Sequence, residues 1–467
     1  MTGIFLHNTL ARTKEELVPR EPGKISLYVC GVTPYDSLHI GHARAFMVYD
    51  VLRRVLEARG LEVQHIQNVT DIDDKIINRA RETGKDALAL AREYSDQTLE
   101  DFAALNILPA HNYPRVTEHI APIVEMVSTL EAKGFAYSSG GDVYFDVSKD
   151  DDYGKLSNQK LEELEAGARV ETGEQKDDPL DFALWKTAKE GEPFWESPWG
   201  NGRPGWHIEC SAMALHLLGP GFDIHGGARE LMFPHHENEV AQSESYLCGE
   251  TGSEAFARIW WHCGVVQVDG KKMSKSLGNF LTVRDALNLA DRNVWRLLFL
   301  MTHPRSPLDY SSEKMAQTKS TWARLKTALM PLDGSASTPA VNEITSGALE
   351  FRAHFDAALS DDLNTPVALA SVFDGVAKWR REGETDQSLI DAIRDAMGVL
   401  GFTFEESQRK AGDALTPQLI ELLIQVREQA RERRDFKTGD VIRDQMKELG
   451  VILEDTAGGA RWKIAEN

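Results

Sequence analysis

The 467-residue sequence predicts an α/β protein in which an insertion splits a parallel sheet and a helical region follows. Residues 25–69 show the order strand, loop, helix and strand, and residues 205–277 repeat an α/β pattern after an intervening stretch. From residue 292 onward, apolar side chains recur at the spacing typical of helices. A chain of this length exceeds what one hydrophobic core supports, so several domains are expected.

The first strand is predicted at residues 25–32, an apolar run with turn residues at both ends. Residues 48–55 follow with apolar side chains at helical spacing, and Gly60 stands where the end of a helix favours glycine. Residues 63–69 form another extended segment, which completes a βαβ unit of a parallel sheet. Such sheets bind ligands at the carboxyl ends of their strands, so Cys30 is expected near a ligand site.

The second α/β stretch is predicted to contain a strand at residues 222–225, a helix at 234–247 and an extended segment at 259–268. These elements are expected to form the other half of the same sheet. Between the halves, residues 115–200 combine an amphipathic helix, a Gly140-Gly141 turn and a loop rich in proline and tryptophan. This stretch is therefore interpreted as an insertion.

The helical region has two further features. A cluster of Gly, Ser, Thr and Pro at residues 333–339 predicts a linker. From residue 417 the pattern predicts one helix, followed by a glycine-rich tail that contains Trp462. Basic side chains are expected near one face of this helix: Arg427, Arg431, Arg434 and Lys437.

Composition limits the class of protein. Apolar residues make up 42% of the chain, as in proteins that bury extensive cores. No apolar run is long enough for a membrane span and the N-terminus lacks the features of a leader, so we expect a cytoplasmic protein without membrane contact. The net charge of −21 argues against delocalised binding to a polyanion but does not exclude a local basic groove. The four cysteines are expected as thiols or thiolates, not as disulfides.

The first candidate site is His39-Ile40-Gly41-His42, in the loop between the first strand and the first helix. Backbone N–H groups at the start of a helix and the helix dipole favour an anion such as a triphosphate. Gly41 lets a nucleotide approach the backbone closely, and His39 and His42 can donate hydrogen bonds to phosphate oxygens in a transition state. The alternative is that the histidines only cap the helix.

The second candidate site is Lys272-Met273-Ser274-Lys275-Ser276, which lies between two glycines and is expected to be a mobile loop. Lys272 and Lys275 could bring two ammonium groups onto departing pyrophosphate. A solvated basic turn is the alternative for such a pair of lysines. Together, the two motifs predict ATP-dependent activation of an amino acid.

A third constellation has the residue types of a metal site. His235 and Glu239 are four positions apart, so one helical face presents an imidazole and a carboxylate. Cys30 ends the first strand and Cys210 lies near the start of a helix, so both thiols could converge at the same sheet edge. Two thiolates, an imidazole and a carboxylate point to zinc. The alternatives are buried cysteines that act as small apolar residues and a helical surface pair.

At this point the sequence resembles the class I aminoacyl-tRNA synthetases, and among them the cysteinyl-tRNA synthetase family, through nearly the whole chain. The similar stretches are residues 28–42, 68–76 (NVTDIDDKI), 181–186 (DFALWK), 202–213 (GRPGWHIECSAM), 233–242, 270–279 and 361–366 (DDLNTP). The resemblance implies a Rossmann-like catalytic domain, ATP-dependent activation of L-cysteine to the adenylate, and transfer to the 3′-terminal ribose of tRNA(Cys). It also implies Mg²⁺ with the ATP, and we expect a monomer.

The resemblance also assigns residues. It implies one zinc ion per chain, which recognises the substrate thiol, with four ligands: Cys30, Cys210, His235 and Glu239. Four protein ligands normally close a zinc site, so we expect Glu239 to be the ligand that substrate displaces. The resemblance implies that catalysis and ATP binding depend on Gly41 and on the charged or polar residues His39, His42, Lys272 and Lys275. It places Trp206, Thr70 and His225 in the amino-acid pocket.

The sequence departs from the family pattern at Ala228 and Glu230, where a glycine and an aspartate are usual. Nucleotide contacts at these two positions are therefore in doubt. Cys248 and Cys263 have no neighbouring residues that suggest coordination, and they are left out of the site.

The resemblance divides the chain into six segments. They are the first half of the catalytic domain (1–115), a connective insertion (116–204), the second half (205–291), a stem-contact region (292–340), a helical bundle (341–412) and a small anticodon-binding domain (413–467). The final basic helix and Trp462 are expected to read the anticodon.

Three alternatives from other classes remain. A cysteine ligase of the same ancestry would join cysteine to an amino sugar and would not need the tail at residues 426–462. A zinc hydrolase would need a second histidine three positions after His236-Glu237, and the sequence has none there. A non-catalytic RNA-binding relative would be expected to lack His39, His42 or Lys275, and all three are present.

Overall fold

The computed structural model describes residues 3–159, 175–249, 255–273, 279–329, 344–404, 411–449, 451–456 and 459–464. Lys275 and the predicted linker at 333–339 lie outside these residues. The chain forms two compact units, residues 1–403 and 404–467. None of the described helices combines the length and the apolar character that crossing a bilayer requires.

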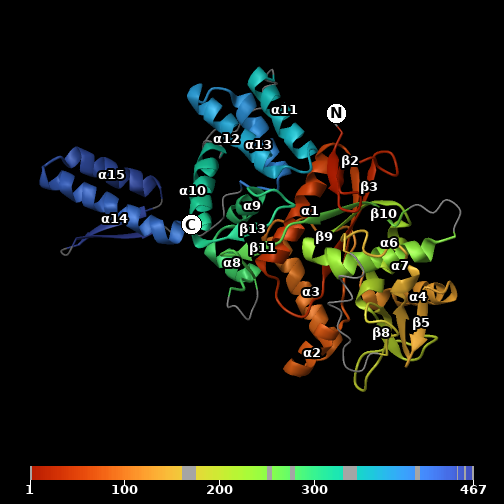
Figure 1. Ribbon diagram of the computed structural model, residues 1–467. Helices are drawn as coiled ribbons and strands as arrows, with labels where there is room; N and C mark the ends of the chain where they lie inside the picture. Colours follow the sequence, from red (N-terminus) through yellow and green to blue (C-terminus); the bar gives the residue numbers. More distant parts are fainter. Residues whose placement is uncertain are drawn as a thin grey trace. The chain divides into compact units, whose positions relative to one another are not determined.

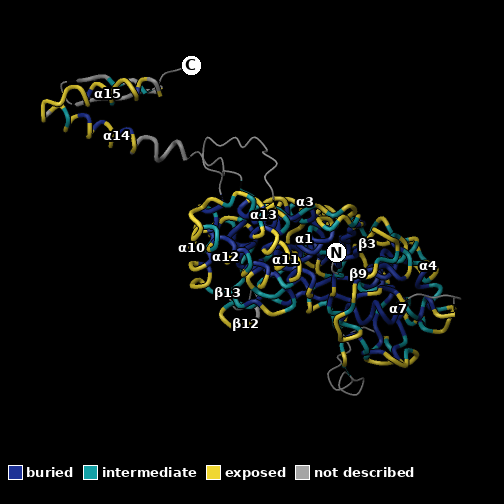
Figure 2. Tube along the Cα trace, turned by 90° about the horizontal axis from the view of Figure 1, so that it is seen from above, coloured by how far each residue is buried: buried dark blue, intermediate teal, exposed yellow. Residues whose placement is uncertain are grey.

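A four-stranded parallel sheet forms the centre of the first unit, as predicted. Its strand order is β10-β9-β3-β4, so the two predicted halves meet where β9 pairs with β3. Its strands are β3 (Lys24–Val32), β4 (Glu62–Val69), β9 (Phe222–Ala228) and β10 (Ala257–Cys263). Figure 2 shows that β3 and β9 are buried and that exposed positions lie along the rim of the unit.

The two crossovers of this sheet run outward from its centre in opposite directions. Helix α1 (Ile40–Ala58) connects β3 to β4, and α7 (Glu237–Leu247) connects β9 to β10. Because βαβ connections are right-handed, the two helices lie on opposite faces of the sheet (Figure 1). The strand order therefore reverses between β3 and β9, and ligands of open α/β sheets bind at such a switch point.

The predicted insertion is a second, antiparallel sheet with one helix packed on it. Its strand order is β5-β6-β7-β8, and Gly140 and Gly141 form the predicted turn between β5 and β6, both with positive φ. The elements are α4 (Ile120–Ala132), β5 (Ala136–Ser139), β6 (Asp142–Phe145), β7 (Phe182–Thr187), β8 (Gly202–Pro204) and then α6 (Trp206–Leu218). One hydrophobic core continues from the central sheet into the insertion and includes Ile123 and Trp185.

The remaining elements of the first unit surround this centre, and the region from residue 292 is mainly helical as predicted. The strands are β1 (Phe5–Asn8), β2 (Thr13–Glu16), β11 (Val266–Val268), β12 (Lys271–Lys272) and β13 (Leu308–Tyr310). The helices are α2 (Asp74–Thr83), α3 (Ala87–Ala104), α8 (Val283–Leu289), α9 (Arg292–Leu300), α10 (Ser312–Leu329), α11 (Ser346–Ser360), α12 (Thr365–Arg381) and α13 (Gln387–Val399). Short single turns cover Val116–Glu118, Val147–Lys149, Arg229–Leu231 and Met232–His236.

One predicted boundary in the second half was wrong. The extended segment at 259–268 is two strands in different sheets, broken at Gly264, where a Cβ would come within 2.2 Å of the Ser306 carbonyl oxygen. The helix predicted at residues 234–247 is present, as a π-helical turn that ends at His236 and continues into α7 at Glu237. Phe233 is extended there, with φ −137° and ψ 133°, as expected for a residue before proline.

The second unit corrects another prediction. The single basic helix expected from residue 417 is two helices, α14 (Ala411–Glu432) and α15 (Phe436–Glu448), followed by the hairpin β14 (Val451–Thr456) and β15 (Gly459–Ile464). Arg434 has φ 61°, and the Asp435 side chain caps α15 by accepting from the Thr438 N–H at 3.1 Å. Arg434 and Lys437 therefore do not share a helix with Arg427, which is itself buried.

Candidate active site and metal centre

A cavity of about 460 Å³ opens at the switch point, beside the carboxyl ends of β3 and β9. Two groups of residues from the sequence predictions line it. The first contains the candidate metal ligands and pocket residues Cys30, Thr70, Trp206, Cys210 and His235. The second contains the candidate phosphate-binding residues His39, Gly41 and His42, together with Met273.

The loop after β3 ends in a capping box that begins α1. The His39 ring is the N-cap, and its Nδ1 accepts from the N–H groups of Gly41 at 3.1 Å and His42 at 3.3 Å. The Nδ1 of His42 accepts in return from the His39 N–H at 3.4 Å, and the rings stack with centroids 3.7 Å apart. A neutral imidazole that accepts at Nδ1 carries its proton on Nε2. Capping therefore fixes both rings in the tautomer that can donate from Nε2.

Burial, with the neighbouring His39 and Lys75, lowers the pKa of His42 to about 3. His42 is therefore neutral at physiological pH. It would act on a phosphate as a hydrogen-bond donor, without a full positive charge.

Gly41 leaves no room for a side chain. A Cβ at this position would lie 2.8 Å from the His39 ring and 3.3 Å from the Met273 methyl group. The second phosphate motif thus begins in contact with the first. Lys272 belongs to β12, whose backbone pairs with Gln267 of β11.

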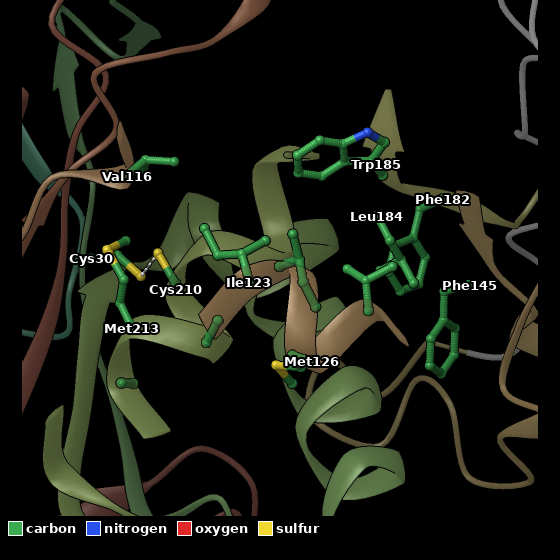
Figure 3. Close-up of a cluster of buried hydrophobic side chains, with 14 of the residues drawn as sticks. Cys30, Val116, Ile123, Met126, Phe145, Phe182, Leu184, Trp185, Cys210 and Met213 are labelled. Atoms are coloured by element: carbon green, nitrogen blue, oxygen red, sulfur yellow. Dashed lines mark hydrogen bonds between the residues drawn. The ribbon is translucent and has the colours of Figure 1, made fainter. Parts of the chain in front are cut away.

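The four candidate metal ligands converge as the sequence predicted. Cys30 Sγ lies 3.6 Å from Cys210 Sγ, 3.6 Å from His235 Nε2 and 3.4 Å from Glu239 Oε1. His235 Nε2 and Glu239 Oε1 are 3.0 Å apart. Figure 3 shows the two sulfur atoms facing each other at the edge of the core shared with the insertion.

The three separations from Cys30 Sγ fit the edges of a tetrahedron, and the 3.0 Å between His235 and Glu239 is somewhat shorter than such an edge. Zinc–sulfur bonds of about 2.3 Å and zinc–nitrogen or zinc–oxygen bonds of about 2.0–2.2 Å place tetrahedral ligand atoms about 3.3–3.8 Å apart. All four ligand atoms lie within 4.8 Å of one another and all four residues are buried. The donor set therefore fits a cation that prefers sulfur and nitrogen ligands.

The pKa values of Cys210 and His235 also agree with a cluster that binds a cation. Burial alone would raise the pKa of Cys210, but contacts with Cys30 and His235 lower it to about 6. Burial would lower the pKa of His235, yet Glu239 and Cys210 raise it to about 10. The ring thus takes up a proton because thiolate and carboxylate groups surround it. A bound metal ion would replace this proton, since an imidazole ligand is neutral.

Glu239 is held from behind the cluster. Its Oε2 accepts from His225 Nε2 at 2.8 Å, and the His225 ring stacks on Trp260 with centroids 4.2 Å apart. Neither Glu239 nor His225 lines the cavity. A second combination, Cys30, His225, His236 and Glu239, also brings four donors together, but of its members only Cys30 lines the cavity.

The two other predicted pocket residues lie beside the cluster. The Trp206 ring stacks on the His235 ring, with centroids 4.4 Å apart and 21° between the planes. The Thr70 hydroxyl donates to Glu209 at 2.9 Å and is buried. Both line the cavity, whereas His225 is behind it.

Four positions that the sequence left open are now located. Ala228 and Glu230, the two positions where nucleotide contacts were in doubt, both line the cavity. Cys263 is buried at the end of β10, and Cys248 is exposed after α7. Neither thiol belongs to the four-donor cluster of the described residues.

Sequence reasoning missed two residues at the site. His207 places its Nδ1 3.0 Å from the Nδ1 of His235 and so contacts the outer side of a candidate ligand. Lys75 lines the cavity beside Trp206. Both residues lie within stretches that resemble the family, but the spacing of residues in the sequence did not assign a role to either.

Comparisons with known proteins identify the family to which the chain is similar. The tRNA synthetases class I (C) catalytic domain family matches residues 16–320, and the DALR domain family matches residues 354–405. The cysteine–tRNA ligase of Desulfitobacterium hafniense is 46% identical over 478 residues and covers 99% of this chain and 99% of the relative. The corresponding ligase of Pelotomaculum thermopropionicum is 48% identical over 484 residues and covers 98% and 99%.

Solved structures share the fold. Methionyl-tRNA synthetase of Mycobacterium tuberculosis in complex with methionyl-adenylate superimposes with a TM-score of 0.57 at 16% identity, covering 81% of this chain and 89% of that one. A leucyl-tRNA synthetase complex of Agrobacterium radiobacter gives a TM-score of 0.57 at 11% identity, covering 82% and 84%.

Proposed function

The chain belongs to the cysteine–tRNA ligases, within the class I aminoacyl-tRNA synthetases, and we propose that it activates cysteine beside a zinc ion in the cavity between β3 and β9. As a member of this family it is a ligase that joins cysteine to tRNA. The relatives match the tail as well as the catalytic domain, because they cover 98–99% of the chain. An amino-sugar ligase would not need that tail.

The observation that carries the zinc assignment is the convergence of four buried donors from three separate segments. Cys30, Cys210, His235 and Glu239 would hold the ion, and zinc prefers such thiolate and imidazole ligands. The ion would supply a Lewis acid that deprotonates a coordinating thiol. Serine would be excluded because its hydroxyl is harder and far less acidic.

Three of the four donors line the cavity, so the open side of the ion would face the substrate. Glu239 is on the opposite side and is fixed by His225. The substrate thiol would reach the ion from the cavity side, and the hydrogen bond from His225 would help to keep Glu239 in place, against the expectation that substrate displaces Glu239. Trp206 and Thr70 would border the bound amino acid.

The phosphate group of residues would act on ATP. The carboxylate oxygen of cysteine bonds to the α-phosphorus, and the electron pair of the broken P–O bond leaves on pyrophosphate. The Nε2–H groups of His39 and His42 would donate to the phosphate oxygens, with Lys272, Lys275 and Mg²⁺ balancing the charge that moves onto pyrophosphate. Gly41 would let the nucleotide lie against the start of α1.

The acyl group would then pass to the 3′-terminal ribose of tRNA(Cys). Helices α11–α13 would contact the tRNA body, and the second unit would read the anticodon, through basic side chains of α14 and α15. The enzyme is proposed to act as a monomer.

The first test is ATP–pyrophosphate exchange with cysteine and with serine, on protein whose zinc content has been measured. We expect exchange with cysteine, no measurable exchange with serine, and one zinc ion per chain. Exchange with serine at a comparable rate would refute selection by a thiolate-binding metal.

The second test removes one ligand. Cys210→Ser should lose zinc and activity together, because a serine hydroxyl is a poor zinc ligand. Cys248→Ser is the matched control, since this thiol is exposed and outside the cluster. Stoichiometric zinc in the Cys210 variant, measured by atomic emission, would refute the ligand assignment.

A further inference from the structure

Lys75 occupies a distinctive position at the cavity. It is the second residue of α2, and its Nζ lies 5.7 Å from the ring centroid of Tyr35 and 5.7 Å from that of Trp206. All three residues line the cavity. An ammonium group within about 6 Å of an aromatic centroid is attracted to the ring face, so both rings hold the cation at this wall.

The carboxylates next to Lys75 in the sequence are engaged elsewhere. Asp73 caps α2 by accepting from the Lys75 backbone N–H at 2.8 Å. Asp74 binds Lys186 at 3.1 Å and also Arg203, and Asp71 accepts from the Thr117 hydroxyl at 2.7 Å. Within the described part of the chain, no carboxylate oxygen forms an ion pair with the Lys75 ammonium. Although Asp36 and Glu230 also line the cavity, the Lys75 ammonium forms no ion pair with a described carboxylate and can receive an anionic substrate group.

This cation lies between the two functional groups of the cavity. On one side is Trp206, whose ring stacks on His235 of the metal cluster. On the other side is His42, close enough for the charge of Lys75 to contribute to its lowered pKa. When cysteine and ATP together span from the metal cluster to the phosphate motif, the carboxyl group and the α-phosphate lie between the thiol at one end and the nucleoside at the other.

We propose that Lys75 is a further catalytic residue, whose ammonium group stabilises the negative charge shared by the attacking carboxylate and the α-phosphoryl oxygens of ATP in the transition state. The inference rests on the proposed function. A carboxylate oxygen bonds to the α-phosphorus, the bond to the bridging oxygen of pyrophosphate breaks with its electron pair, and no proton moves. Lys75 keeps its proton and offsets the repulsion between two anions that must meet.

The structural alternative is that Lys75 only steadies the Trp206 ring. The two roles affect different kinetic parameters. A group that stabilises the reacting phosphoryl lowers kcat when it is removed, whereas a support for the amino-acid pocket raises the KM for cysteine.

The experiment compares Lys75→Met, Lys75→Arg and Lys85→Met in ATP–pyrophosphate exchange, with zinc content and circular dichroism of each variant. Lys85 is a matched control, because it is exposed and its Nζ pairs with Glu93 at 2.5 Å, away from the cavity lining. We expect Lys75→Met to lower kcat about 100-fold, as for the loss of one preorganised charge contact, with the KM for cysteine within about twofold. Lys75→Arg should recover at least about tenfold, since its charge is retained.

Two outcomes would overturn the inference. One is a wild-type kcat in Lys75→Met, and the other is a raised KM for cysteine with an unchanged kcat. Absence of exchange in the wild-type protein would instead contradict the proposed function, so the two failures are distinguishable.

Discussion

His65 is a residue that the fold holds in its neutral form. It lies within β4, and both ring nitrogens are buried without a hydrogen-bond partner among the described residues. Burial, with the charges of Arg53 and His111, lowers the pKa of its imidazole from 6.5 to about 3. The unfolded chain therefore binds a proton near pH 6.5 that the folded chain does not bind until about pH 3. The stability contributed by the neutral ring is complete above pH 6.5, and it decreases as the pH is lowered from 6.5 towards 3.

The resulting prediction concerns His65→Leu. Relative to wild type, the variant should gain about 2 kcal/mol in the free energy of unfolding between pH 7.5 and pH 5, because leucine takes up no proton in the unfolded state. The measurement is urea denaturation at pH 7.5 and at pH 5, in which the unfolding transition of the first unit is followed. Between pH 7.5 and pH 8.5 the difference between the two proteins should stay constant. An equal loss of stability at pH 5 in both proteins would contradict this account.

The sequence predicted individual site residues best where spacing and chemistry agree. His235 and Glu239 could be paired from their four-residue separation, and their atoms are 3.0 Å apart. The two cysteines are 180 positions apart, so their convergence could only be expected from strand order and family resemblance. His225 was expected in the pocket but lies behind Glu239, because sequence does not tell which face of a buried strand a side chain uses. Lys75 was missed because its motif, NVTDIDDKI, contains five other acidic or polar residues that were no less prominent.

At the scale of elements, the start of α1 joins helix formation to the proposed phosphate binding. Gly41→Ala should push the His39 ring from its cap, because the added Cβ would lie 2.8 Å from that ring. We expect a loss of about 1 kcal/mol in stability, as for a weakened N-cap, and roughly 100-fold slower adenylate formation from the displaced rings. Thermal denaturation and ATP–pyrophosphate exchange measure the two effects.

Gly398→Ala is the matched control for this prediction, because a Cβ there meets nothing within 4 Å and the residue lies in α13. It should leave exchange unchanged and raise stability by up to about 1 kcal/mol. Full exchange activity in Gly41→Ala would show that the nucleotide does not need the space at this helix start.

Most elements were predictable from local patterns, and the exceptions have physical causes. The apolar run at 25–32 and the helical spacing at 48–55 identify β3 and α1, because burial imposes periods that sequence retains. The run at 259–268 hides a break at Gly264, where close approach to a carbonyl and not hydrophobicity ends the strand. The break between α14 and α15 depends on the positive φ of Arg434 and on the Asp435 side chain that caps α15. Neither feature can be recognised from a run of basic residues.

At the scale of the whole first unit, Asp362 joins segments that are distant in sequence. Its Oδ1 accepts from the His7 N–H at 2.9 Å and the Trp261 indole at 3.0 Å, and its Oδ2 accepts from Arg305 at 2.5 Å. Asp362 is fully buried and has φ 58°, a backbone conformation that few residues other than glycine, asparagine and aspartate adopt. The DDLNTP stretch thus ties the helical region to β1 and β10.

Asp362→Ala should therefore cost about 3 kcal/mol in the unfolding transition of the first unit, because the half-buried Arg305 guanidinium, the His7 N–H and the buried Trp261 indole lose their acceptor. Asp361→Ala is the control, since its exposed pair with Lys14 contributes at most about 1 kcal/mol. Guanidinium titration monitored by tryptophan fluorescence compares the two. Equal stability of both variants would mean that Asp362 does not hold these segments together.

The split of the central sheet has a consequence for how the chain is made. Cys30 is synthesised 180 positions before Cys210 and 209 positions before Glu239, and β9 must dock on β3 before these side chains meet. While a ribosome is still translating the insertion, the emerging first half carries one isolated thiol and no complete set of donors. Capture of a metal ion by the full cluster would therefore be a late event of biogenesis, and it would hold together two halves that the ribosome delivers separately.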